Sequence, residues 1–252
     1  MSRAEHVQSL ERGLSVIRCF DADHARLTLT DVANRTGLTR ATARRLLLTL
    51  KALGYVSTNG RHFSLTPRVL DIGYAYLSSL NIQQIAQPFL EALSEQVNES
   101  VSVTVLDGAD IIYVARVPTK RIMTISLGLG SRLPAYCTSM GRVLLAELTP
   151  EQLRAIVPER LEPRTEHTIR TRDALEAELA TVRQQGWALV DEELEIGLRS
   201  LAAPLCDAGG RAVAAMNVST HAGRTVTDEI HASILPAVLR TARDVSEALA
   251  KR

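Results

Sequence analysis

The stretch LTDVANRTGLTRATARRLLLTL, residues 29–50, combines apolar residues at helical spacing with a high density of threonine and arginine. Its first half predicts a short helix that Thr30 caps and Gly37 ends. A second helix is expected to begin after Thr39 and to stop at Gly54. The apolar stripe expected on this second helix consists of Ala43, Leu46, Leu47, Leu50 and Leu53. Two short helices joined by a glycine-containing turn predict a helix-turn-helix.

The arginines and threonines of this stretch lie largely off the apolar stripe. In a helix-turn-helix, residues near the start of the second helix contact base edges in the major groove, where arginine binds guanine through two hydrogen bonds. We expect Arg40 or Arg44 to read bases, Arg45 to contact base or phosphate, and Thr30 to contact phosphate. The set expected in the groove is Thr39, Arg40, Thr42, Arg44 and Arg45. A basic helix alone is equally consistent with an ordinary solvated face.

Residues 55–65, YVSTNGRHFSL, favour the DNA-binding interpretation because they predict a β-hairpin directly after the second helix. Asn59 and Gly60 suit a type I′ turn, in which Val56 would face Phe63 across the strands. Arg61 would lie beside the tip, where a basic residue reaches the DNA backbone. With a further helix expected over residues 6–20, the order of elements is that of a winged helix-turn-helix.

Charge is unevenly distributed along the 252 residues. Residues 1–68 carry 11 Lys and Arg against 5 Asp and Glu, whereas residues 69–252 carry 18 against 23. A basic segment followed by an acidic one predicts a polyanion-binding domain attached to a domain with another task. We expect a cytoplasmic protein, because no apolar run is long enough to span a bilayer and the first residues do not read as a signal peptide.

The second half alternates β-branched runs with helical patterns. Residues 101–107, 111–117 and 122–130 predict three strands, residues 200–220 predict a hairpin, and residues 227–251 predict a closing helix. Short connections between strands indicate an antiparallel α+β domain. Residues 67–81 predict an apolar linker helix, so the expected domains are residues 1–66, 67–81 and 82–252.

Nothing in this half matches a catalytic or metal-binding motif. The serine in TSMG lacks the surrounding glycines of a nucleophile elbow, and Cys137 has no histidine in its stretch. The three cysteines are expected to be reduced, buried thiols, and the carboxylate run DEELE, residues 191–195, is expected to be a solvated loop. We therefore expect no enzymatic activity, no cofactor and no metal. A small-molecule enzyme and a constitutive DNA-binding protein remain the alternatives.

Several segments together resemble the IclR family of bacterial transcription regulators: SLERGLSVIRCF and FSLTPRVLDIG in the first part, then RLPAYCTSMGRVLLA, GWALVDEELEIGLRSLAAPL and AAMNVST. LDIGYAYLSSL, YVARVPTKRIM and VSTHAGR resemble the branch that controls protocatechuate, 4-hydroxybenzoate and β-ketoadipate catabolism. The resemblance implies a GAF-like effector-binding domain after the winged helix-turn-helix. It also implies operator DNA and a small organic acid of that class as partners, and self-association as a dimer or tetramer through the linker helix.

The resemblance also implies an effector site. Thr138 and Ser139 are expected at a helix N-terminus, which favours a carboxylate but is equally suited to plain capping. Asn217 and Ser219, two apart on a strand, point to one face. Asp191 has the same charge as the expected ligand, so it would bind a hydroxyl group or orient Arg199. The full set of expected effector-binding residues is Leu129, Tyr136, Ser139, Met140, Asp191, Leu201, Asn217 and Ser219.

Overall fold

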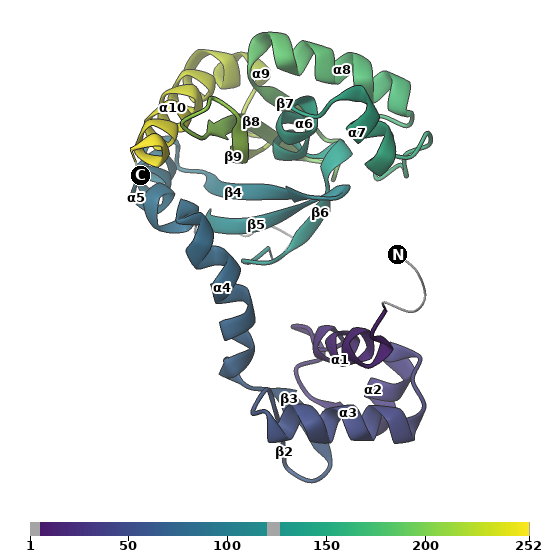
Figure 1. The fold of residues 1–252 in the computed structure, drawn as a ribbon. Helices are drawn as coiled ribbons and strands as arrows, with labels where there is room; N and C mark the ends of the chain where they lie inside the picture. Colours follow the sequence, from purple (N-terminus) through teal and green to yellow (C-terminus); the bar gives the residue numbers. More distant parts are fainter. Residues whose placement is uncertain (1–5, 120–126, 252) are drawn as a thin grey trace. The chain divides into compact units, whose positions relative to one another are not determined.

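The protein is represented by a computed structural model that describes residues 6–119 and 127–251. The chain forms two compact units, Met1–Ser79 and Leu80–Arg252. Figure 1 shows helices and a small sheet in the first unit, and a larger sheet with helices on both faces in the second. Within the described ranges, no helix is long and apolar enough to cross a membrane.

The first unit is a winged helix-turn-helix, in which three helices pack against a three-stranded antiparallel sheet of order β1-β3-β2. Its core contains Val16, Val32, Leu47 and Val56, all almost completely buried. The elements are α1 (Gln8–Arg18), β1 (Leu27–Thr28), α2 (Leu29–Thr36), α3 (Arg40–Ala52), β2 (Val56–Thr58), β3 (His62–Leu65) and α4 (Leu70–Leu80).

The start of α2 differs from the sequence prediction. Thr28, not Thr30, is the N-cap: its hydroxyl accepts from the amide of Asp31, whose carboxylate accepts from the amide of Thr28 in return. This reciprocal pair satisfies two free helix N–H groups, which Thr30 could not do from inside the first turn. The predicted end at Gly37 and the predicted cap of α3 by Thr39 are both confirmed.

The wing is a hairpin as predicted, but its turn type and its strand register differ from the prediction. Asn59 accepts the amides of Arg61 and His62 with its side-chain carbonyl, so only Gly60 needs a positive φ. The connection is therefore longer than a two-residue type I′ turn. Thr58 is paired with Phe63, and Val56 lies opposite Leu65 instead of Phe63.

The second unit contains a six-stranded antiparallel sheet of order β6-β5-β4-β9-β8-β7. Helices α5 and α10 cover one face, and α6 packs on the other with α8 behind it (Figure 1). The elements are α5 (Ile82–Val97), β4 (Ser100–Asp107), β5 (Asp110–Val117), β6 (Arg132–Pro134), α6 (Ser139–Ala146), α7 (Pro150–Ile156), α8 (Arg172–Gln185), β7 (Ala188–Asp191), β8 (Leu198–Cys206), β9 (Ala212–His221), α9 (Thr227–Glu229) and α10 (Leu235–Ala250).

Two predictions for this unit need revision. The predicted strand over residues 122–130 lies partly outside the described residues, and its described part, Leu127–Gly130, includes a turn instead of a strand. The strand that lies beside β5 at the edge of the sheet is β6, which begins two residues after Gly130. The closing helix is not regular throughout, because Ile230–Ile234 form one π-helical stretch between α9 and α10.

A close backbone approach fixes α6 against the turn that precedes it. A Cβ atom on Gly141 would lie only 2.1 Å from the carbonyl oxygen of Ala135, a contact that no side-chain movement relieves. Gly141 therefore lets the helix start directly beside Ala135–Cys137. This contact holds Thr138 and Ser139 at a defined place above the sheet.

Gly141→Ala should lower the free energy of unfolding of the second unit by about 1–3 kcal/mol, because the added methyl group overpacks a backbone contact. The matched control is Gly13→Ala in α1, where nothing lies within 4 Å of the added Cβ. There the usual helix preference for alanine should stabilise by up to ~1 kcal/mol. Urea unfolding of both variants measures the two changes, and equal signs would contradict the packing argument.

Candidate functional site

The exposed face of α3 carries arginine side chains over the length of its first two turns. Ala43, Leu47 and Leu50 face the core, whereas Arg40, Arg44 and Arg45 are exposed. Thr39 and Thr42 also lie at the helix start, but the Thr39 hydroxyl caps the amide of Thr42 and donates to its hydroxyl. The arginines are thus available for DNA, and the threonines shape the end of the helix that would approach phosphate.

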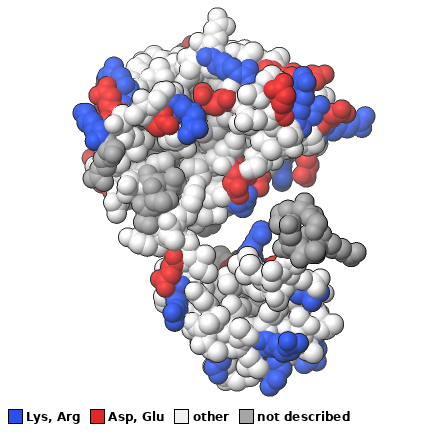
Figure 2. Space-filling view, viewed as in Figure 1, with Lys and Arg blue, Asp and Glu red and all other residues white. Residues whose placement is uncertain are grey.

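Two further predicted contacts lie on the same unit. Thr30 is exposed in the first turn of α2, and Arg61 is exposed at the wing tip. Figure 2 shows mostly basic side chains among the charged groups on the visible face of this unit, whereas acidic and basic groups intermingle on the second unit. This distribution suits binding of a polyanion by the first unit.

A cavity lies in the second unit between the sheet and the N-terminus of α6. It contains about 500 Å³ of space between atoms, part of which opens to solvent. Its apolar walls come from Leu127, Leu133, Met140, Leu194 and Leu198. Its polar lining includes Tyr113, Arg116, Ser139, Ser200, Asn217 and Ser219.

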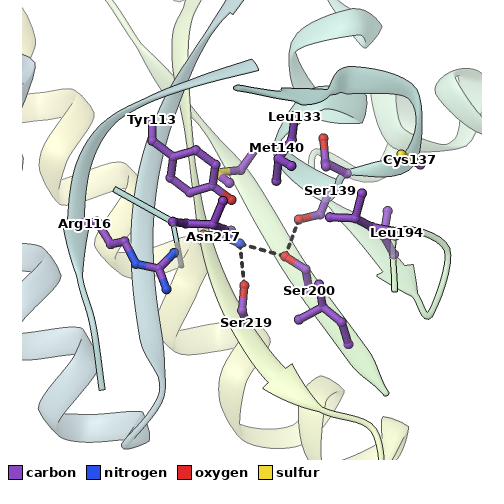
Figure 3. Close-up of a pocket in the computed structure, with 14 residues that line it drawn as sticks. Tyr113, Arg116, Leu133, Cys137, Ser139, Met140, Leu194, Ser200, Asn217 and Ser219 are labelled. Atoms are coloured by element: carbon purple, nitrogen blue, oxygen red, sulfur yellow. Dashed lines mark hydrogen bonds between the residues drawn. The ribbon is translucent and has the colours of Figure 1, made fainter. Parts of the chain in front are cut away.

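The polar side chains form one hydrogen-bonded row across strands β9 and β8 to α6 (Figure 3). The Asn217 amide donates to Ser219 Oγ at 2.9 Å and to Ser200 Oγ at 2.7 Å. Ser200 Oγ is in turn 2.7 Å from Ser139 Oγ. The strand register explains the row, because Ser200 pairs with Ser219 and Asn217 is two residues from Ser219 on the same face.

Asn217 is left with an unsatisfied acceptor. Its side-chain oxygen is buried and has no hydrogen-bond partner among the described residues, although the residue is only 2% exposed. A buried polar atom without a partner costs ~1–3 kcal/mol, so it is expected to have one when the cavity is filled. A hydroxyl group of a ligand is a suitable donor.

Arg116 contributes a positive charge to the cavity. Its guanidinium lies on the Asn217–Ser219 side of the cavity in Figure 3, 6.0 Å from the centre of the Tyr113 ring. No ion pair of Arg116 occurs within residues 6–119 and 127–251. Burial raises the pKa of Tyr113 to about 12, with partial offset by the Arg116 charge, so the phenol is neutral. The lining thus presents one cation, neutral polar groups and apolar walls.

Four of the eight predicted effector residues line this cavity, namely Ser139, Met140, Asn217 and Ser219. The structure places the other four elsewhere. Leu129 is 53% exposed, and the Tyr136 hydroxyl donates to the carbonyl of Glu162. Leu201 is buried but pairs with Val218 on the face away from Asn217. Asp191 binds Arg199 at 2.7 Å, which is the orienting role considered for it.

Sequence reasoning missed several lining residues next to the ones it chose. Val190 and Ser200 line the cavity, but their neighbours Asp191 and Leu201 were predicted. Because side chains alternate along a strand, an error of one residue selects the opposite face. Arg116 had no local signal, since only the pairing of its strand brings it to the cavity.

The carboxylate run at residues 191–195 is not simply solvated. Glu193 is 8% exposed and forms an ion pair with Arg142 of α6, with 2.6 Å between Glu193 Oε2 and Arg142 Nη2. The expectation of a solvated loop is therefore wrong for this residue. Of the cysteines, which are all free thiols, Cys19 and Cys137 are buried and Cys206 is only partly buried.

Comparison with known proteins identifies the family. The IclR helix-turn-helix domain matches residues 9–60, and the bacterial transcriptional regulator IclR C-terminal domain matches residues 74–247. The chain belongs to the IclR family of transcription regulators. As a regulator of this type, it binds operator DNA through its helix-turn-helix.

Three similar proteins illustrate the breadth of the match within the IclR family. The Pca regulon regulatory protein of Pseudomonas putida is 44% identical, over 97% of this chain and 85% of its own length. A crystal structure of a candidate transcriptional regulator from Rhodococcus sp. RHA1 is 55% identical, with a TM-score of 0.87 over 98% of this chain and 99% of its own. The inducer-binding domain of a PobR double mutant from Acinetobacter, in complex with 3-hydroxybenzoic acid, is 32% identical, with a TM-score of 0.60 over 65% of this chain and 97% of its own.

Arg40→Ala and Arg44→Ala should each weaken operator binding by ~1–3 kcal/mol if the side chain binds guanine through two hydrogen bonds. Fluorescence anisotropy, with an operator fragment selected from genomic DNA by the wild-type protein, measures the change. Arg154→Ala, at an exposed arginine of the second unit, is the matched control. Wild-type affinity in both α3 variants would remove the recognition-helix assignment.

Proposed function

We propose that this regulator responds to a small organic acid bound in the cavity of its second unit, and that the cavity favours a hydroxylated aromatic carboxylate. The observation that carries the proposal is the combination of Arg116 with the buried row around Asn217. A guanidinium binds a carboxylate through two parallel hydrogen bonds, and the apolar walls would bury a ring. A ring hydroxyl would then supply the donor that Asn217 lacks.

The names of the similar proteins support the same ligand class. One relative is a Pca regulon regulatory protein, and one related inducer-binding domain holds 3-hydroxybenzoic acid. The candidate effectors are protocatechuate, 4-hydroxybenzoate and β-ketoadipate. All three carry a carboxylate, but only the first two carry the ring hydroxyl that would donate to Asn217.

We further propose that the protein is not an enzyme and acts in the cytoplasm, where its operator DNA lies. The burial of Cys137 supports the first point, because burial raises its pKa to about 11 and leaves the thiol un-ionised and unreactive at neutral pH. The proposed domain limits are residues 1–66, 67–81 and 82–252. An enzyme would consume the ligand, and a constitutive DNA-binding protein would not respond to it.

Arg116→Gln, and separately Asn217→Ala with Ser219→Ala, should weaken binding of the effector by about tenfold or more, because hydrogen bonds to charged groups contribute ~1.5–3 kcal/mol. A thermal-shift screen of the three candidate acids selects the effector, and calorimetry measures its affinity. Arg211→Gln at an exposed hairpin is the control, and operator binding without effector should be unchanged in all variants. Wild-type effector affinity in both site variants would place the site elsewhere.

Self-association is proposed because apolar side chains remain exposed on two helical stretches. Val7, Leu10 and Leu14 share one side at the start of α1, and Leu70 and Tyr74 lie on α4. A single winged head contacts few base pairs, so a specific operator is expected to contain paired half-sites.

Wild-type protein should sediment as a dimer or tetramer at micromolar concentration. Leu10→Glu with Tyr74→Glu should shift the equilibrium toward monomer, because a charge in a buried apolar contact is unfavourable. Sedimentation equilibrium measures both, with Leu129→Glu as a control for an exposed leucine elsewhere. A wild-type protein that stays monomeric with and without DNA would contradict the proposal.

A further inference from the structure

Arg142 is the most deeply buried charged side chain near the cavity, and it lies one helical turn beyond Ser139 on α6. It is 2% exposed. Its Nη2 atom binds Glu193 Oε2 at 2.6 Å, and its Nε donates to the carbonyl oxygen of Tyr136 at 3.2 Å. Its Nη1 lies 3.7 Å from Glu178 on α8. One side chain therefore joins three segments that are distant in sequence.

Glu193, which forms the ion pair with Arg142, fixes the loop between β7 and β8. Its Oε2 also accepts the amide of Ile169 at 3.1 Å, and its carbonyl oxygen accepts the hydroxyl of Thr168 at 2.6 Å. Glu192 next to it has a positive φ of 57° and accepts the amide of Gly197 with its carboxylate. The loop over residues 192–197 is thus held at its start by one buried ion pair and by its own turn.

The segments that Arg142 joins both contribute lining residues to the cavity. Its partner Tyr136 precedes Cys137 and Thr138, which line one side. Its partner Glu193 precedes Leu194, which lies on the same side as Cys137 in Figure 3, away from Arg116. Leu198 follows the same loop and also lines the cavity. The position of this side relative to Arg116 determines the size of ligand that fits.

A buried ion pair is a weak source of stability, since the cost of removing both charges from water offsets most of their attraction. Such a pair instead fixes the relative positions of the segments that it joins. We propose that Arg142 is a positioning residue that sets the width of the ligand cavity by tying the loop that carries Leu194 to the segment that carries Cys137. The identity of the ligand rests on the proposed function, but the position of the walls does not.

A wall that is already in place does not have to be ordered when the ligand binds. Ordering a side chain or a loop on binding has an entropic cost, which reduces the affinity. Loss of the tie should therefore weaken binding, and it should weaken binding of a small ligand more than that of a bulky one. A looser wall tolerates a larger ring substituent, so selectivity by size should fall.

The test replaces both charges together, because a single substitution would leave one buried charge unpaired and risk unfolding. In Arg142→Met with Glu193→Gln, the amide oxygen at position 193 still accepts from Ile169, and the methionine fills the volume. Arg154→Met with Glu176→Gln is the matched control, because this pair is more exposed and separated by 3.7 Å. Urea unfolding and operator binding without effector should remain close to wild type.

Two measurements follow for each protein. Calorimetry with 4-hydroxybenzoate and with the bulkier 4-hydroxy-3-methoxybenzoate should show about tenfold weaker binding of the smaller acid in the Arg142 variant, with a smaller loss for the larger. Alkylation of Cys137 by iodoacetamide, followed by mass spectrometry, should become several-fold faster, because a loosened Leu194 loop would expose a thiol that is fully buried in the wild-type protein. Cys206 in the same protein is the internal reference.

The alkylation result decides the proposal independently of the ligand. Faster labelling of Cys137, with unchanged labelling of Cys206, supports the tie even if neither acid binds the wild-type protein, which would count against the proposed function alone. Wild-type labelling of Cys137 in a folded Arg142 variant would overturn the tie. Equal losses of affinity for both acids would overturn its role in selectivity.

Discussion

Polar groups buried on the inner face of the second sheet need partners, because each one left without a partner costs ~1–3 kcal/mol. Ser200 and Ser219 satisfy this requirement through Asn217, and Ser139 completes the row from the end of α6. The row can form only if α6 begins directly above β8, and Gly141 permits that position by its contact with Ala135. One requirement for hydrogen bonding therefore fixes the helix, and the helix encloses the cavity.

Inside the cavity, the same requirement is unmet at two points. The Asn217 oxygen has no partner among the described residues, and no carboxylate of those residues pairs with Arg116. Elsewhere in the unit, buried charges are paired, as Arg142 is with Glu193. Two other buried atoms without hydrogen-bond partners among the described residues, Arg172 Nε and Thr220 Oγ1, do not line the cavity. The two groups inside it favour the proposed ligand chemistry, with an anion near Arg116 and a donor near Asn217.

Local signals in the sequence were sufficient for the first unit. Capping residues, a glycine stop and a helical stripe depend on neighbours in the chain, so the helix-turn-helix, Gly37 and Thr39 were predicted correctly. The errors were small shifts. Thr28 caps α2 instead of Thr30, because Asp31 completes the reciprocal pair with Thr28. The hydrogen bonds of the Asn59 side chain lengthen the turn of the wing.

The cavity was harder to predict, because it depends on how strands pair across the sheet. Alternation within one strand was enough to put Asn217 and Ser219 on one face. It could not determine which residues of β7 and β8 face the cavity. Val190 and Ser200 do, whereas Asp191 and Leu201 do not. Arg116 reaches the site only because β5 pairs with β4, and β4 pairs with β9.

A ligand changes operator binding only to the extent that it binds two states of the protein with different affinity. A cavity with fixed walls gives affinity and selectivity, but on its own it does not make the ligand affinity differ between two states of the protein. In the proposed function, the difference would come from ligand contacts that form in one state and not in the other, and Arg116 and Asn217 are candidates for such contacts in the described cavity. Coupling energies of ~1–3 kcal/mol are typical, which is the scale of one charge-assisted hydrogen bond gained or lost. In the proposed function, the fixed row and the Arg142 tie would therefore set which ligand enters, whereas Arg116 and Asn217 would contribute to the free energy that a regulatory response requires.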